Sequence, residues 1–127
     1  MYALVDTATE VTAVNGVNCT SCTGDLYDPT DAIADGQGFV NQNKTETVPY
    51  GSGSFIGNEA SDDFCLVLGE CIEDFKYLLV SDQKEINLSG DINGVFGWAR
   101  PDRPMQLNPG HTPDTDKAPF MLKALKE

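Results

Sequence analysis

One aspartate carries the clearest candidate chemistry in this chain. Asp6 ends an apolar segment and is followed by two hydroxyl-bearing residues, Thr7 and Thr9. A carboxylate in such a place could take up or release a proton, although an Asp after a strand is more often a turn former or a helix cap. Asp6 therefore needs other residues around it before its setting predicts a function.

Two later segments have residue types that could complete a site. In residues 48–57, glycines at positions 51 and 53 allow a tight hairpin, with Tyr50 beside a tip that could approach a ligand. In residues 92–101, two apolar residues precede Gly97.

The four cysteines form two close pairs in sequence, Cys19 with Cys22 and Cys65 with Cys71. The chain also has three N-x-S/T sequons, so local disulfides in an oxidising compartment are the natural interpretation. The alternatives are a zinc site at Cys19-x-x-Cys22 and a thioredoxin-like redox motif; turn-forming neighbours disfavour the latter. The candidate glycosylation sites are Asn18, Asn43 and Asn87.

The composition excludes several function classes. Eight Lys and Arg against 20 Asp and Glu give a formal net charge of −12, without a basic patch that would attract nucleic acid or an anionic membrane surface. No apolar run approaches the roughly 20 residues of a membrane span. We expect no metal, since no acidic loop has calcium-site spacing, and the lone His111 is interpreted as a loop residue.

The elements that must position these residues are mostly short strands. Turn residues separate the candidate strands, which predicts an all-β fold of one domain. The expected strands are residues 2–5, 10–14, 54–56, 64–68, 75–80 and 94–98. A helix is expected at residues 118–127, after a long loop over residues 100–117 that is rich in Pro and Asp.

The motifs, taken in order, resemble the N-terminal lobe of pepsin-like aspartic peptidases, the pepsin and cathepsin D family, and in particular members from single-celled eukaryotes. The resemblance runs from about residue 2 to the end of the chain. Its motifs are Asp6-Thr7-Ala8, the Cys19 and Cys22 loop, Leu26-Tyr27-Asp28-Pro29, Tyr50-Gly51-Ser52-Gly53-Ser54, the extra pair Cys65 and Cys71, and Asn93-Gly94-Val95-Phe96-Gly97-Trp98-Ala99.

The resemblance implies a role for each site residue. Asp6 would be one of two carboxylates that share a proton, one activating water and the other polarising the scissile carbonyl. Thr7 would lock two active-site loops, Thr9 would hydrogen-bond the outer oxygen of Asp6, and Gly97 would let the backbone pack beneath it. The substrate-covering flap would consist of Tyr50, Gly51 and Ser52.

Several departures from the family pattern leave a second hypothesis open. Ala8 replaces the motif glycine and would crowd the loop, while Ala13 replaces a tryptophan that supports the flap tyrosine, and Asn93 replaces an aspartate. The second Asp-Thr/Ser-Gly is absent; its nearest candidate, Asp114-Thr115-Asp116, has no glycine. The alternative to an endopeptidase is therefore an inactive pepsin-fold protein that binds or scaffolds partners.

The expectation for the whole chain, residues 1–127, is one lobe, incomplete at both ends, of a two-lobed protein. Its implied partners are a polypeptide substrate and the missing C-terminal lobe, or another chain, that completes the active site. No cofactor is implied. The resemblance and the acidic composition suggest a secreted, lysosomal or vacuolar location in an acidic, oxidising pathway.

Overall fold

The computed structural model describes residues 2–9, 11–34, 36, 38–67, 70–88 and 90–98. Within these residues the chain is mostly strand, with one five-residue helix. The elements are β1 (Ala3–Asp6), β2 (Ala13–Asn15), α1 (Thr30–Ala34), β3 (Val40–Tyr50), β4 (Gly53–Val67), β5 (Glu70–Lys84) and β6 (Gly94–Gly97). The all-β expectation is confirmed.

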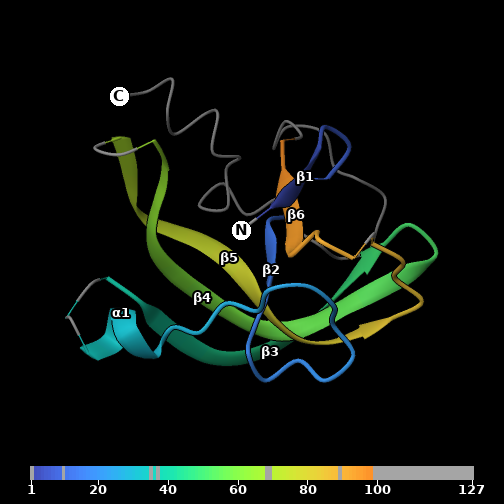
Figure 1. The fold of residues 1–127 in the computed structure, drawn as a ribbon, viewed down its shortest axis with the longest axis horizontal. Helices are drawn as coiled ribbons and strands as arrows, with labels where there is room; N and C mark the ends of the chain where they lie inside the picture. Colours follow the sequence, from blue (N-terminus) through green and yellow to red (C-terminus); the bar gives the residue numbers. More distant parts are fainter. Residues whose placement is uncertain are drawn as a thin grey trace.

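The strands form one sheet in the order β1-β6-β2-β5-β4-β3. β3, β4 and β5 are joined as an antiparallel meander, whereas β2 runs parallel to β5 and β1 runs parallel to β6. Figure 1 shows β4 and β5 as long curved strands crossing the molecule, with β1, β2 and β6 grouped beside one another. The short N-terminal strands are therefore held by a later part of the chain.

Both faces of the sheet are buried in its centre. Neighbouring residues of a strand point to opposite faces, and the sequence supplies apolar side chains for each. On β6, Val95 joins a core cluster with Phe55 and Val80, while the next residue, Phe96, joins a second cluster with Phe75. These two cores explain why β6 is apolar at successive positions rather than at alternate ones.

An aromatic group forms much of the second core. The ring of Phe96 lies 5.4 Å from that of Phe64 and 5.5 Å from that of Trp98, centroid to centroid. Phe75 lies 5.1 Å from Phe64. Trp98 is half-buried and packs against this second core.

The structure corrects several expected element boundaries. The strand expected at residues 10–14 is β2, which begins at Ala13, and the strand expected at 75–80 is part of the longer β5, Glu70–Lys84. Residues 54–56 and 64–68 were expected as separate strands, but 54–56 and 64–67 lie in the single strand β4. β3 was not expected, because its sequence is polar; it is an exposed edge strand. α1 was also missed, and it is held at its start by Asp28, whose carboxylate accepts the backbone N–H of Thr30 at 3.0 Å.

The expected C-terminal helix at residues 118–127 and the loop at residues 100–117 lie outside the described residues, as does His111.

Candidate functional site

Asp6 is the last residue of β1 and is fixed by β6. It is paired in register with Gly97, and its backbone carbonyl accepts the N–H of Trp98 at 2.8 Å. The N–H of Gly97 in turn donates to the hydroxyl of Thr12 at 3.2 Å, which holds the start of β2 to the same strand. The main chain beneath Asp6 is thus tied from both sides, so the position of the carboxyl group is well defined.

Each carboxylate oxygen of Asp6 accepts one hydrogen bond. Oδ1 accepts the backbone N–H of Ala8 at 2.8 Å, and Oδ2 accepts the hydroxyl of Tyr50 at 2.8 Å. The side chain is half-buried. Hydrogen bonds of this kind fix the orientation of a carboxyl group. No carboxyl group hydrogen-bonds to Asp6 in the part of the chain that the structure describes.

Tyr50 reaches Asp6 from the end of β3. The tip that follows, Gly51 and Ser52, turns the chain into β4, and Gly51 has a φ of 57°, a conformation that favours glycine. The Tyr50 ring lies 5.3 Å from that of Phe55 and contacts the first core. Burial and the hydrogen bond to Asp6 raise the pKa of Tyr50 to about 12, so it is a protonated donor at neutral and acidic pH.

Comparison of the sequence with protein-family models and with curated proteins gives no match.

Ala8 fits the turn after Asp6, although the sequence predicts that it would disturb this turn. The residue is exposed and is not among the residues with positive φ, so the loop after Asp6 has a conformation open to alanine. Its amide also donates to Asp6, as described above. Because Ala8 is exposed, the expected crowding of the loop by its methyl group is not seen among the described residues.

The two threonines of the motif have different environments. Thr9 is buried, and its hydroxyl accepts the N–H of Val11 at 3.3 Å rather than contacting Asp6, so the expected Thr9–Asp6 hydrogen bond is not formed. Thr7 is exposed and makes no hydrogen bond through its hydroxyl within the described residues. A locking role for Thr7 therefore needs a group outside the part of the chain described.

Asn93 contributes more than the sequence suggested. It is buried, its Oδ1 accepts the N–H of Tyr2 at 2.7 Å, and its Nδ2 donates to the carbonyl of Asp25. Its backbone bonds to Tyr2 and Asn15 as well. An aspartate in this place has no N–H to donate to Asp25, so asparagine suits the site. The sequence marked it only as a departure from the family pattern, directly before an apolar strand.

Ala13, the other departure, is a core residue. It is buried and pairs in register with Leu78 of β5 and Val95 of β6. Tyr50, which the resemblance would place against a tryptophan at position 13, instead donates to Asp6.

Both expected disulfides are present, Cys19–Cys22 and Cys65–Cys71. A zinc site at the first pair is therefore excluded in this structure, because its sulfur atoms are bonded to each other. Among the described residues, no group of His, Cys, Asp and Glu gathers in a way that could hold a metal ion. The three candidate glycosylation residues, Asn18, Asn43 and Asn87, are all exposed.

The described part of the chain contains no helix of the length and apolar character that a membrane crossing needs.

Proposed function

We propose that this chain is the N-terminal lobe of a pepsin-like aspartic endopeptidase, with Asp6 as one of its two catalytic carboxyl groups. The observation that supports this most is the hydrogen bond from Tyr50 to Oδ2 of Asp6. It joins the candidate acid to the candidate flap, two motifs that are far apart in sequence. The order of the other motifs is consistent with the same family.

The chemistry would use the two oxygens of Asp6 differently. Oδ1 is held by the amide of Ala8 and fixes the plane of the carboxyl group. Oδ2 would face the attacking water once Tyr50 has moved aside to cover a bound peptide. A second carboxyl group would share one proton with Asp6, so that one acid acts as base while the other polarises the scissile carbonyl.

The second acid would come from a C-terminal lobe or another chain, and the surface beside Asp6 supports this. β1 is an edge strand, and Tyr2, Leu4 and Val5 are 72%, 40% and 58% exposed. Thr7, next to Asp6, is exposed as well. Apolar side chains along a strand with one unpaired edge favour packing against another protein surface.

The proposal extends to the setting of the protein. Two disulfides and exposed sequon asparagines fit a glycoprotein that is secreted or delivered to a lysosome or vacuole. The substrate would be a polypeptide bound beneath the tip of the β3–β4 hairpin.

A catalytically inactive pepsin-fold binding protein is the second candidate. The observation that favours it is the same hydrogen bond, because Tyr50 occupies the oxygen that an attacking water would need. If Tyr50 never leaves Oδ2, the hairpin would serve only as a fixed part of the structure.

The experiment is a peptide-cleavage assay at acidic pH with the natural protein, including whatever lobe or partner chain it carries. Asp6→Asn should abolish cleavage, whereas Asp91→Asn, an exposed acid in a turn, should leave it unchanged. Cleavage that survives Asp6→Asn would refute the catalytic role. An inactive natural protein that still binds polypeptides would support the second candidate instead.

A further inference from the structure

The β3–β4 hairpin tip is separated from the rest of the sheet by a bulge on β5. Ile56 of β4 pairs with Asp82, but the next residue, Gly57, pairs with Val80, so Ser81 is the extra residue. The hydroxyl of Ser81 donates to the carbonyl of Ile56 at 3.3 Å. A bulge bends its strand, so β5 can change direction here, next to the part of β4 that leads to the hairpin tip.

The short ladder beyond the bulge carries the tip. Phe55 pairs in register with Gln83, and the Phe55 ring packs against Tyr50. Contacts that hold Asp82 and Gln83 at the end of β5 therefore also hold Phe55, against which the Tyr50 ring packs.

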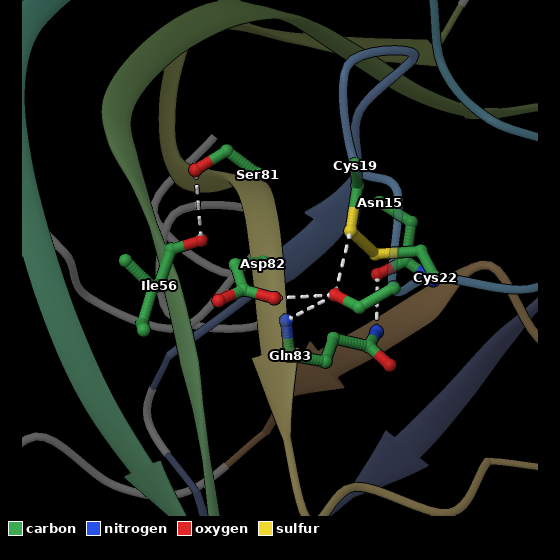
Figure 2. The surroundings of a disulfide bond; sticks show 8 residues. Asn15, Cys19, Cys22, Ile56, Ser81, Asp82 and Gln83 are labelled. Carbon is green, nitrogen blue, oxygen red and sulfur yellow. Dashed lines mark hydrogen bonds between the residues drawn. A yellow bond between two sulfur atoms is a disulfide. The ribbon is translucent and has the colours of Figure 1, made fainter.

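The Cys19–Cys22 loop contacts β5 at this place. The hydroxyl of Ser21 donates to Oδ1 of Asp82 at 2.6 Å and accepts the backbone N–H of Gln83 at 2.8 Å. The side chain of Gln83 donates to Oδ1 of Asn15 at 2.8 Å. Figure 2 shows Asp82 and Gln83 beside the disulfide, with Ser81 directed at Ile56.

The disulfide explains why a serine in a loop can hold a strand. Only two residues lie between Cys19 and Cys22, and Cys19 is buried in the first core. The loop is thus attached to the core at one end and closed on itself, which removes much of the conformational freedom that Ser21 would otherwise lose on binding β5.

We propose that Ser21 is a positioning residue that holds the β3–β4 hairpin tip, and Tyr50 with it, over Asp6, and that the Cys19–Cys22 disulfide keeps Ser21 in place. The consequence for peptide hydrolysis rests on the proposed function. The effect on the position of Tyr50 does not rest on the proposed function, because it concerns only the contact between the side chains of Tyr50 and Asp6.

The test follows Tyr50 in the intact, disulfide-bonded protein. Tyrosine labelled at ring carbon Cζ gives one NMR signal per residue, and Tyr50→Phe identifies the signal of Tyr50. With its pKa at about 12, Tyr50 should remain mostly protonated at about pH 11. In Ser21→Ala, we expect the pKa to fall toward the ordinary value of about 10, so that most of Tyr50 is ionised at that pH.

Matched variants separate this effect from a general loss of structure. Thr23→Ala removes an exposed hydroxyl just outside the loop and should leave the Tyr50 signal unchanged. Ser21→Thr keeps the hydroxyl and should retain most of the effect. Cys19→Ser with Cys22→Ser should shift Tyr50 as Ser21→Ala does, whereas the same pair of changes at Cys65 and Cys71 should not.

Hydrogen exchange gives a second measurement near neutral pH. The amides of the ladder beyond the bulge, including Phe55, should exchange at least several-fold faster in Ser21→Ala than in the parent protein. An unchanged Tyr50 titration and unchanged exchange in folded Ser21→Ala would overturn the proposal. If both change but the natural protein cleaves no peptide, the positioning role stands and the proposed function fails. If the natural protein cleaves peptides but neither property changes, the proposed function stands and the positioning role fails.

Discussion

The hydroxyl of Tyr50 lies 2.8 Å from Oδ2 of Asp6, although the two residues are 44 positions apart and belong to the opposite edge strands of the sheet, β3 and β1. Two edges can meet in this way only if the sheet curves back on itself. The long strands β4 and β5 are visibly bent in Figure 1. The curvature of the sheet, rather than any local sequence, therefore creates the candidate site.

Replacing Tyr50 by phenylalanine should lower the free energy of unfolding by about 1 kcal/mol, because it removes one hydrogen bond to a half-buried carboxylate and keeps the ring packed on Phe55. Urea denaturation measures this. The matched control is Tyr2→Phe, since Tyr2 is 72% exposed, and it should have no measurable effect. Equal stabilities of the Tyr50 variant and the parent would contradict the contact.

The contribution of Tyr50 should also depend on alkaline pH. Its pKa is raised to about 12 in the folded chain from about 10 in the unfolded one, so its stabilisation is complete below about pH 10 and is lost as pH rises toward 12. The stability difference between the parent and Tyr50→Phe should be constant from neutral pH to about 10 and then shrink. A difference that grows above pH 10 would show that folding lowers the pKa of Tyr50 rather than raising it.

The all-β class follows from the sequence, whereas the catalytic role of Asp6 and the flap role of Tyr50 stay predictions. Asp6 and Tyr50 were chosen for their residue types and motif order, and the structure brings them into contact. β3 was missed because it is an exposed edge strand whose side chains are polar, so no apolar alternation marks it. Its existence follows from pairing with β4, a tertiary property that its own residues do not encode.

The expectations that failed at the site were those for single side chains. The sequence could not show that the hydroxyl of Thr9 is satisfied by the amide of Val11, or that Ala8 has an exposed methyl group. It also marked Asn93 only as a departure, since the acceptor at Asp25 is 68 residues away. Hydrogen-bond partners of this kind are set by the path of the chain after folding.

Asn93→Asp should destabilise the protein by about 3 kcal/mol at neutral pH. The change removes the donor to the carbonyl of Asp25 and buries a negative charge next to that oxygen. Asn87→Asp adds the same charge at an exposed position and is the control. Thermal unfolding measures both variants. The loss should be smaller in acid, where the new carboxyl group is protonated; a loss independent of pH would argue against the buried charge as its cause.

Gly57→Ala should be among the most damaging single changes, with a loss of at least about 2 kcal/mol. A Cβ atom at this position would overlap the backbone carbonyl of Leu79 on the neighbouring strand. Because the overlapped atoms belong to the backbone of a paired strand, they cannot move aside as a flexible side chain could. Gly90→Ala is the control, because its added methyl group would meet no atom within 4 Å. Chemical denaturation of the two variants compares them directly. Similar stabilities would mean that β4 and β5 are less tightly apposed than the structure has them.

Removal of the Cys65–Cys71 disulfide, by serine at both positions, should lower the free energy of unfolding by about 2 kcal/mol, as expected for a short closed loop. Since this bond joins β4 to β5 away from Asp6, the Tyr50–Asp6 contact should survive. Urea denaturation gives the first quantity, and the Tyr50 ring signal in NMR gives the second. A Tyr50 signal that moves with this change would show that the whole hairpin, not only its tip, sets the contact.

The pairing of β1 with β6 has a consequence for how the chain folds. Ala3 lies beside Gly94, so the strand that ends in Asp6 has no partner until most of the described chain has been made and ordered. Contacts between such distant residues form slowly, because a long loop must close before they give any stabilisation. A nascent or cleaved chain that ends before residue 94 would therefore contain Asp6 and Tyr50 without a strand to hold Asp6. The candidate site should be one of the last features to form and among the first to be lost on truncation.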